Sequence, residues 1–241
     1  MLLTKARWYH EKPRPCSSRL PWGVKARFFS VKTHMKTVTV KIGSSVLLSQ
    51  RDELDEFRVA HITDQVRRLR DKGIGVILVV SGAVACGSSV VDVKSGGQRQ
   101  RRMAAGIGQA MLISVVRRIF STKGLGIAQI LLTRDQLDSE SKSHEINRLI
   151  QGYLKMGIIP VINENDVVDL NSFGGNDFLG ARVAILVNAE QYLILSTMAG
   201  SSFGVGGSEA KQQTIDMVRQ EHIQAKIVNG KRKNILLEAL L

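Results

Sequence analysis

Short apolar segments alternate with longer amphipathic segments along most of this chain, and this alternation limits the possible folds more than any other feature. Strands are predicted at residues 37–42, 76–80, 126–132, 158–162, 191–196 and 225–228. Helices are predicted at residues 53–72, 98–120, 138–156, 176–187, 209–220 and 234–241. Apolar strands separated by helices are typical of a parallel sheet that is covered on both faces. The chain is therefore expected to form an α/β fold with a mainly parallel sheet.

Apolar side chains recur every three or four residues within the predicted helices, which places them on one face of each helix. In residues 53–72 this face contains Phe57, Val59, Ile62, Val66 and Leu69. In residues 98–120 the side chains expected in the core are Met103, Ile107, Met111, Ile113 and Val116. Thr133 and Gln136 have the spacing of a capping box for the helix at residues 138–156. Residues 35–241 contain no repeat and no low-complexity tract, so one domain is predicted.

The first 34 residues differ in composition from the rest of the chain. They contain eight Lys and Arg residues and one acid, Glu11, so they carry +7 of the formal net charge of +13. A segment that is rich in Arg, contains Ser and is nearly free of acids is typical of an organellar transit peptide. The string Arg27-Phe28-Phe29-Ser30 is similar to the residues that precede a mitochondrial processing site. This interpretation places the protein in the mitochondrial matrix.

The same leader contains Pro13, Pro15 and Pro21, which oppose the amphipathic helix that transit peptides form. The alternative is an unstructured extension, with Met35 as the working start and a soluble cytoplasmic protein. No run of 18 or more apolar residues is present, so no membrane span is predicted. The two cysteines are too few for a disulfide framework or a zinc site, and Cys86 is expected to be a small buried residue.

The remaining charge of +6 is spread along the chain rather than gathered in one segment. Five arginines of the helix at residues 98–120 contribute to it, namely Arg99, Arg101, Arg102, Arg117 and Arg118. Aromatic residues make up only 5% of the sequence, so no stacking platform for nucleic acid accompanies these charges. A nucleic-acid binder stays open as an alternative, but attraction of small anionic substrates explains the charge more simply.

Small and polar residues follow four of the predicted strands, at the edge where parallel sheets bind ligands. Lys41 is followed by Gly43-Ser44-Ser45, and VSGAVACG, NEND and GGND occupy residues 80–87, 163–166 and 174–177. A further glycine-rich loop, GVGGSEAK, ends at Lys211. Backbone N–H groups of such loops and the helix N-termini after them bind phosphate, so the two lysine-bearing loops favour a nucleoside triphosphate. The sequence contains neither a P-loop motif nor a Rossmann dinucleotide motif.

Seven strings resemble, in family order, the motifs of glutamate 5-kinases: VKIGSS, VSGAVACG, AAGIGQA, AQILLTRDQ, GIIPVINENDVV, FGGNDFLGARVA and GVGGSEAK. Glutamate 5-kinases are part of the amino acid kinase family, and the resemblance implies that family's three-layer αβα sandwich. It also implies transfer of the terminal phosphate of ATP to the side-chain carboxylate of L-glutamate, with Mg²⁺, as the first step of proline biosynthesis. A homo-oligomer is expected, and neither a nucleic acid nor a membrane is expected as a partner.

The same resemblance implies a role for each matching position. The implied catalytic residues are Lys41, Asp177 and Lys211. The residues implied to bind the substrate are Ser81, Gly82, Asp166 and Asn176. The residues implied to bind ATP are Lys41, Gly43, Ser44, Ser196, Thr197, Gly204, Gly206, Gly207 and Lys211. No protein ligand to a metal is implied, because magnesium would be held mainly by ATP oxygens and water.

The chemistry of a carboxylate substrate agrees with these residue types. Its pKa is ~4.3, so the nucleophile is already ionised at neutral pH and needs no general base. The barrier lies in bringing one anion against another, and two lysines, backbone donors and Mg²⁺ lower it by positioning and charge neutralisation. Asp166 and Asn176 offer oxygen acceptors to the substrate's α-ammonium group. Both residues also suit a purely structural role as turn or helix caps.

Three departures from the family pattern are visible. Thr197 stands where the family has an acid, and Gly175 replaces the aspartate that precedes Asn176. The chain also passes from Gly200 to the loop at residues 204–207 without the segment that covers adenine and ribose. Nucleotide binding is therefore expected to be weak, in the millimolar range or about −4 kcal/mol. Two alternatives stay open: a catalytically impaired homologue with a binding or regulatory role, and a related kinase with another acidic substrate.

Overall fold

The computed structural model describes residues 35–50, 53–197 and 207–241, so the predicted leader and the loop after Thr197 lie outside the described residues. A six-stranded sheet forms the centre, with the strand order β3-β4-β2-β1-β5-β6. Every pair of neighbouring strands is parallel. The strands are β1 (Thr37–Ile42), β2 (Gly75–Val80), β3 (Gly126–Leu132), β4 (Ile158–Glu164), β5 (Gln191–Ser196) and β6 (Gln224–Asn229).

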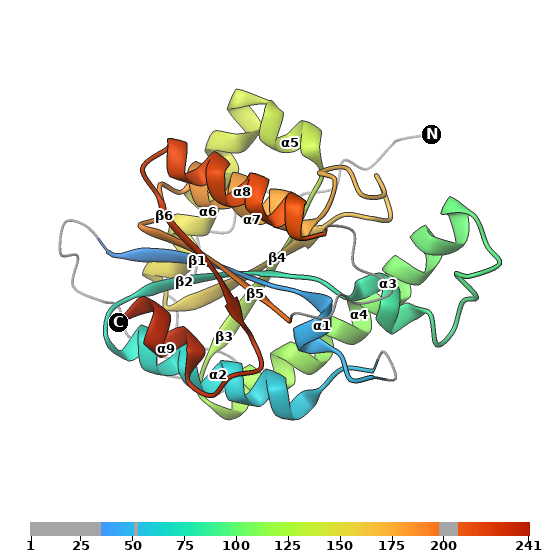
Figure 1. Ribbon diagram of the computed structural model, residues 1–241, viewed down its shortest axis with the longest axis horizontal. Coiled ribbons are helices and arrows are strands. Elements are labelled where there is room, and N and C mark those ends of the chain that lie inside the picture. The colour runs from blue at the N-terminus through green and yellow to red at the C-terminus, as the bar shows by residue number, and fades with distance from the viewer. Residues whose placement is uncertain (1–34, 51–52, 198–206) are drawn as a thin grey trace, which may run out of the picture.

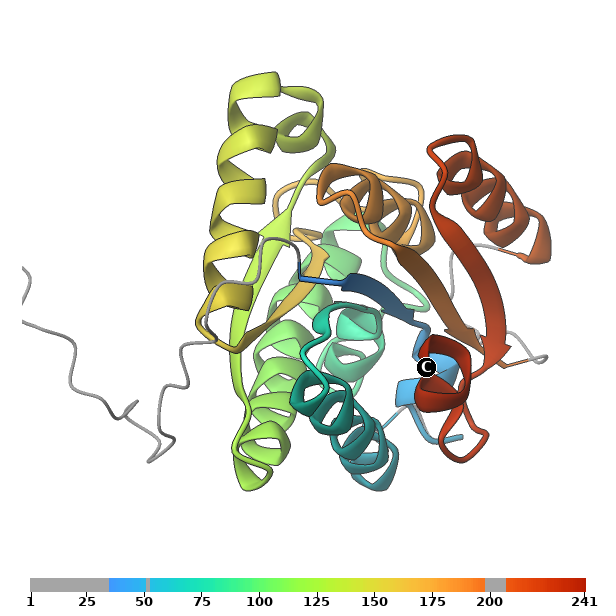
Figure 2. The same ribbon diagram turned by 90° about the vertical axis from the view of Figure 1, so that its left-hand side faces the viewer.

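Helices cover both faces of this sheet, as Figures 1 and 2 show. One face is covered by α1 (Ser44–Leu47), α2 (Glu56–Asp71), α3 (Ala83–Gly87), α4 (Gln98–Thr122) and α9 (Ile235–Leu240). The other face is covered by α5 (Arg134–Asp138), α6 (Glu140–Lys155), α7 (Asn176–Leu186) and α8 (Ser208–Gln220). The prediction of a three-layer αβα sandwich with a mainly parallel sheet is confirmed.

Two large apolar clusters, one on each side of the sheet, hold the layers together. On β1, Val38, Val40 and Ile42 join the cluster under α2, α4 and α9. Successive side chains of a strand point to opposite faces, so Thr39 and Lys41 point toward the other helix layer. Strands β1 and β2 are buried along their whole length, and β2 is apolar throughout after Gly75. Lys41 is the charged residue of β1, and its position places a cation under α7.

Helices α3 and α4 pack with their backbones in direct contact, because glycine stands at the point of crossing. A Cβ atom at Gly108 would lie 1.8 Å from the carbonyl oxygen of Ala83, and one at Gly87 would lie 1.9 Å from that of Ala104. No side chain larger than hydrogen fits at either position without a shift of the backbone. This close approach brings the loop after β2 next to the N-terminal half of α4.

Several local expectations were wrong. Phe57 is 78% exposed, so it lies outside the apolar face of α2. On α4, Met103, Ile107 and Met111 are exposed by 52%, 37% and 42%. The inward face of α4 is instead made by small residues and by larger apolar residues spaced four apart. These include Ala104, Ala105, Gly108, Leu112 and Val116. Small residues are needed there because α3 lies so close.

The capping box of Thr133 and Gln136 forms, but it caps the short helix α5 rather than the long helix α6. The chain leaves the helical conformation at Ser139, which separates the two. Cys86 is buried, in agreement with the prediction. Among the described residues, α4 is long and apolar enough, by length and composition alone, to cross a membrane. Because its inward face packs against the core and against α3, we describe it as a core helix.

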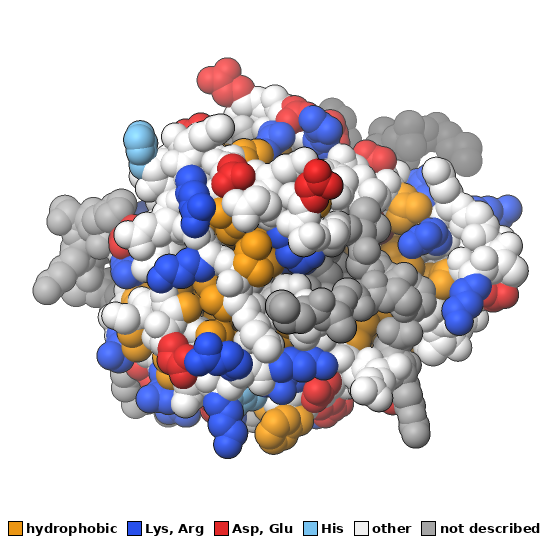
Figure 3. All heavy atoms as spheres, in the orientation of Figure 1, with side chains coloured by type: hydrophobic (Ala, Val, Ile, Leu, Met, Phe, Trp, Pro, Cys, Tyr) orange, Lys and Arg blue, Asp and Glu red, His pale blue; other side chains and the backbone are white. Residues whose placement is uncertain are grey.

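Basic side chains are mixed with acidic ones on one face of the molecule. On the face seen in Figure 3, Lys and Arg side chains are spread among Asp and Glu side chains. Two arginines of α4 have separate partners: Arg118 pairs with Glu56, and Arg102 donates to the carbonyl oxygens of Val167 and Val168. Among the described residues, these two arginines are therefore held by contacts within the fold.

Candidate active site

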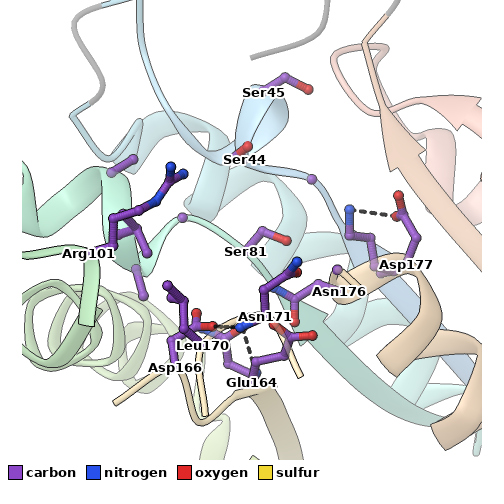
Figure 4. Close-up of a pocket in the computed structure, with 18 of the residues that line it drawn as sticks. Ser44, Ser45, Ser81, Arg101, Glu164, Asp166, Leu170, Asn171, Asn176 and Asp177 are labelled. Atoms are coloured by element: carbon purple, nitrogen blue, oxygen red, sulfur yellow. Dashed lines mark hydrogen bonds and ion pairs between the residues drawn. The ribbon is translucent and has the colours of Figure 1, made fainter. Parts of the chain in front are cut away.

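The carboxyl ends of β1, β2, β4 and β5 open into a pocket of about 400 Å³ (Figure 4). Ten of the residues singled out from the sequence line it: Lys41, Gly43, Ser44, Ser81, Gly82, Asp166, Asn176, Asp177, Ser196 and Lys211. Thr197 and Gly207 lie outside its lining, and Gly204 and Gly206 lie outside the described residues. Residues from four separate loops, spread over 170 positions of sequence, therefore meet at one edge of the sheet.

Two lysines meet on a single buried carboxylate at one side of this pocket. The Nζ atom of Lys41 lies 2.6 Å from Oδ1 of Asp177, and Nζ of Lys211 lies 3.6 Å from Oδ2. Lys41 and Asp177 are 6% and 3% exposed. Burial lowers the pKa of Lys41, the Asp177 carboxylate raises it in part, and the charge of Lys211 lowers it further. Asp177 thus holds two like charges together at a place where an anion would be strongly attracted.

The three residues reach this point from three different elements. Lys41 is the second-last residue of β1, Asp177 lies in the first turn of α7, and Lys211 lies in the first turn of α8. The N-termini of both helices add a favourable partial charge for an anion. Gly175 precedes α7 with φ 119° and ψ 156°, a conformation nearly confined to glycine. Gly175 departs from the family pattern, but glycine suits the backbone conformation that the chain adopts at this position.

Gly43 contributes space to the pocket rather than a hydrogen-bond donor for a ligand, because its N–H group is already used within the fold. Its N–H group donates to the carbonyl oxygen of Leu195 at 2.9 Å, which ties the end of β1 to β5. A Cβ atom at this position would lie 3.2 Å from the same oxygen and 3.7 Å from Nζ of Lys41. Glycine therefore keeps the corner beside Lys41 open.

Two acidic side chains form the other side of the pocket. Burial raises the pKa of Glu164 to about 7, and the neighbouring charge of Asp166 raises it as well. The pKa of Asp166 is also raised by burial, while Arg101 opposes that rise. The two carboxyl groups are hydrogen-bonded to each other. At neutral pH this pair is therefore poised to take up or release a proton.

The backbone around the acidic pair is fixed by its own hydrogen bonds. Oε1 of Glu164 accepts from the N–H group of Phe173 at 3.2 Å, and Oδ1 of Asp166 accepts from that of Asn171 at 3.0 Å. The side chain of Asn163 donates to Oε1 of Gln109 at 2.7 Å, which anchors the loop to α4. Figure 4 shows Glu164, Asp166 and Asn171 gathered at one side, with Asp177 on another. The pocket therefore has an acidic end and a cationic end.

The pocket lining also includes residues to which sequence reasoning gave no role in the site, among them Glu164, Arg101 and Asn171. The sequence placed Glu164 in the NEND loop at the edge of the sheet but gave it no role; the strand was expected to stop at residue 162, whereas β4 continues to Glu164. A charged residue directly after a buried strand is a usable signal. Arg101 gave no such signal, because only the close packing of α3 on α4 brings it to the pocket.

The model of the amino acid kinase family matches residues 36–229. The chain belongs to the amino acid kinase family. This membership agrees with the resemblance that the seven sequence motifs carry, and the match includes every residue of the pocket described above.

Curated relatives in this amino acid kinase family are glutamate 5-kinases. Glutamate 5-kinase 2 of Bacillus subtilis is 40% identical over 172 residues, which are 70% of this chain and 46% of the relative. Glutamate 5-kinase of Clostridium acetobutylicum is 29% identical over 245 residues, covering 86% of this chain and 92% of the relative. Glutamate 5-kinase of Bacteroides thetaiotaomicron is 30% identical, over 87% of this chain and 68% of the relative. The chain thus spans about half of the first relative and most of the second.

Solved structures of two other kinases share the amino acid kinase fold of this chain. An isopentenyl phosphate kinase superposes with a TM-score of 0.60 at 15% identity, over 85% of this chain and 95% of its own. UMP kinase from Ureaplasma parvum superposes with a TM-score of 0.59 at 12% identity, over 86% of this chain and 95% of its own. At this low identity the likeness concerns the fold alone.

Proposed function

We propose that this protein is a kinase that transfers the terminal phosphate of ATP to the side-chain carboxylate of L-glutamate, giving glutamyl 5-phosphate, the first step of proline biosynthesis. The observation that carries the proposal is the meeting of Lys41 and Lys211 on buried Asp177 beside a pocket with an acidic far end. A cationic end suits a phosphate, and an acidic end suits an ammonium group. The similarity to glutamate 5-kinases supports the same substrate pair.

The acidic end is proposed to bind the α-ammonium group of the amino acid. Glu164 and Asp166 offer carboxylate oxygens there, and both line the pocket. The side-chain oxygen of Asn176 is buried and accepts no hydrogen bond from any of the described residues. A buried acceptor without a donor is costly, so this oxygen is suited to receive an N–H group of a ligand. Together these oxygens can accept all three hydrogens of an ammonium group.

The α-carboxylate of the substrate is proposed to bind Arg101. This side chain reaches the pocket from α4, and Figure 4 shows it on the side away from Asp177. The guanidinium group binds carboxylates with two parallel hydrogen bonds, which fixes orientation as well as charge. With both α-groups held at this end, the side-chain carboxylate points toward Lys41 and Lys211.

The cationic end is proposed to hold the phosphates. The ionised side-chain carboxylate attacks the γ-phosphorus, a new O–P bond forms, and the bond between the γ-phosphorus and the β,γ-bridging oxygen breaks as ADP leaves. Lys41 and Lys211 neutralise charge on the transferring group, while Asp177 fixes both cations in place. No proton needs to be removed, because the carboxylate is ionised at neutral pH.

Magnesium is proposed to enter with the nucleotide. Within residues 35–50, 53–197 and 207–241, no group of three or more His, Cys, Asp and Glu side chains is arranged to hold a metal ion. Both oxygens of Asp177 already face a lysine. Phosphate oxygens and water are sufficient ligands for Mg²⁺, and the ion supplies further neutralisation of phosphate charge.

A hydroxylamine-trapping assay tests this proposal. The parent protein is expected to form glutamyl hydroxamate from L-glutamate and ATP, and to use L-aspartate poorly. Lys211→Ala should abolish the product, whereas Lys155→Ala, which removes an exposed lysine of α6, should retain it. If the parent binds ATP and glutamate without turnover, the impaired-homologue alternative is correct. Turnover with another acid instead of glutamate supports the related-kinase alternative.

A further inference from the structure

The segment that carries the two acids of the pocket is held by the sheet on one side only. The register of β4 with β2 ends at Ile162, whereas its register with β3 continues to Glu164. The last two residues of β4 therefore have a strand neighbour only in β3, and residues 166–168 then form a turn. We call residues 163–168, which contain Glu164 and Asp166, the acidic loop. Its position depends on contacts other than those of the sheet.

The first of these contacts is a buried pair of amide side chains. Successive strand residues point to opposite faces, and Val161 joins the apolar cluster on the α4 side, so Asn163 also points toward α4. There Nδ2 of Asn163 donates to Oε1 of Gln109 at 2.7 Å. Oδ1 of Asn163 accepts from the N–H group of Glu164 at 3.0 Å. Asn163 and Gln109 are 2% and 8% exposed, so water competes little for these bonds. Gln109 thus holds the side chain that binds the backbone of Glu164.

The second contact lies two helical turns earlier on α4, at Arg102. Its Nε atom donates to the carbonyl oxygen of Val167 at 2.8 Å, and its Nη2 atom donates to that of Val168 at 2.7 Å. Residues seven positions apart lie on the same side of a helix, so Arg102 and Gln109 both face the acidic loop. The planar guanidinium group presents its donors in a fixed geometry, which suits two successive carbonyl oxygens. We call Arg102 and Gln109 together the α4 clamp.

Helix α4 and the acidic loop lie close together between these two contacts. A Cβ atom at Gly106 would lie 3.2 Å from Cγ2 of Val167, which is closer than carbon atoms normally pack. Neither Arg102 nor Gln109 lines the candidate active site, whereas Glu164 and Asp166 both do. Figure 4 shows these two acids on the same side of the pocket. An effect of the α4 clamp on the site must therefore pass through the acidic loop.

We propose that Arg102 and Gln109 are positioning residues, which fix the acidic loop to α4 and so set where Glu164 and Asp166 lie in the pocket. The inference rests on the proposed function, in which these two carboxylates bind the α-ammonium group of L-glutamate. Helix α4 is a suitable support because its inward face is buried in the core. Loss of the α4 clamp weakens binding of the amino acid and leaves phosphate transfer at the cationic end intact.

Steady-state kinetics of two clamp variants test the proposal. Arg102→Met is expected to raise the KM for L-glutamate about fivefold, and Gln109→Met about tenfold, because the second change also leaves a buried donor of Asn163 without an acceptor. In both variants kcat and the KM for ATP should stay within about twofold of the parental values, since the cationic end is untouched. Arg102→Lys keeps a donor for the loop carbonyls, and its KM for L-glutamate should lie between those of the parent and Arg102→Met.

Two control variants separate positioning from loss of charge and from loss of stability. Arg99→Met removes another exposed arginine of α4, which donates no hydrogen bond to the acidic loop within the described residues, and should leave the KM unchanged. Ile119→Val removes one methylene from the core under α4 and lowers stability away from the loop. If either control raises the KM for L-glutamate as much as Arg102→Met does, the positioning role is wrong. Parental KM values in both clamp variants also overturn it.

Hydrogen exchange tests the α4 clamp even if the parent protein shows no turnover, which would contradict the proposed function alone. The N–H groups of Asn165 and Val168 donate to the carbonyl oxygens of Leu132 and Asn165 in the parent. In Arg102→Met these two amides should exchange faster, while amides of α7 keep the parental rate. Such confined acceleration supports the clamp. Unchanged exchange in the acidic loop, or equal acceleration in all helices, contradicts it.

Discussion

The two ends of the pocket are built in different ways. At the acidic end, Glu164 and Asp166 accept backbone hydrogen bonds, and the loop that carries them is anchored to α4 through Asn163 and Gln109. At the cationic end, Lys41 and Lys211 depend on one carboxylate, Asp177. The acidic end therefore has fixed hydrogen-bonding geometry, whereas the cationic end depends on charge balance. We expect substrate selectivity to come from the acidic end and the rate of phosphate transfer to come from the cationic end.

Loss of the inner lysine should have the largest effect and should fall on rate. Lys41→Met removes the cation but keeps most of the side-chain volume. We expect kcat to fall by about 10³-fold, because a group that neutralises charge on the transferring phosphoryl group is lost. The KM for glutamate should change little. Steady-state kinetics with both substrates measure the effect, and a fall of less than about tenfold would contradict the assigned role of Lys41.

Crowding of the α3–α4 contact should disturb the acidic end through packing. Gly108→Ala forces a methyl group against the carbonyl oxygen of Ala83, which should lower the free energy of unfolding by about 1–3 kcal/mol. Gly152→Ala on α6 is the matched control, because nothing lies within 4 Å of its Cβ position. That change should stabilise the protein by up to ~1 kcal/mol. Denaturant unfolding compares the two, and equal effects would show that the close packing is unimportant.

Removal of the cation at the amino-acid end should affect binding rather than rate. Arg101→Met is expected to raise the KM for glutamate about tenfold, since one ion pair to the α-carboxylate is lost. The KM for ATP and the value of kcat should stay within about twofold. A variant whose ATP affinity falls while its glutamate affinity is unchanged would show that Arg101 faces the nucleotide instead.

The smallest expected effect is a pH dependence carried by the acidic pair. Because the pKa of Glu164 is raised to about 7, this side chain is mostly protonated below that pH and mostly ionised above it. An ammonium group binds the ionised form better, so the KM for glutamate should fall by a few fold as pH rises from 6 to 8. Glu164→Gln cannot titrate and should show a flatter profile. A parent profile as flat as that of the variant would remove Glu164 from the binding site.

Much of the fold could be predicted from the sequence, because apolar strands and amphipathic helices alternate with clear boundaries. The bounds of β1, β3 and β5 agree with those expected. The short helices α1 and α3 were missed, because four or five residues contain too little periodicity to recognise. The apolar face of α4 was assigned to its larger side chains, whereas the contact with α3 selects its small ones.

The candidate site was predictable where loops follow strands and not where packing brings a helix to the pocket. The end of β1 and the starts of α7 and α8 pointed to Lys41, Asp177 and Lys211, and the structure places these three together. Arg101 reaches the pocket through contacts between helices, which no local pattern encodes.

A crystal structure with L-glutamate and a non-hydrolysable ATP analogue tests the central claim most directly. The account predicts that the glutamate side-chain carboxylate faces the γ-phosphate beside Lys41 and Lys211. The α-ammonium group should then lie within hydrogen-bonding distance of Glu164, Asp166 and Asn176. A nucleotide whose phosphates contact neither lysine, or a glutamate bound in the opposite direction, would contradict the account.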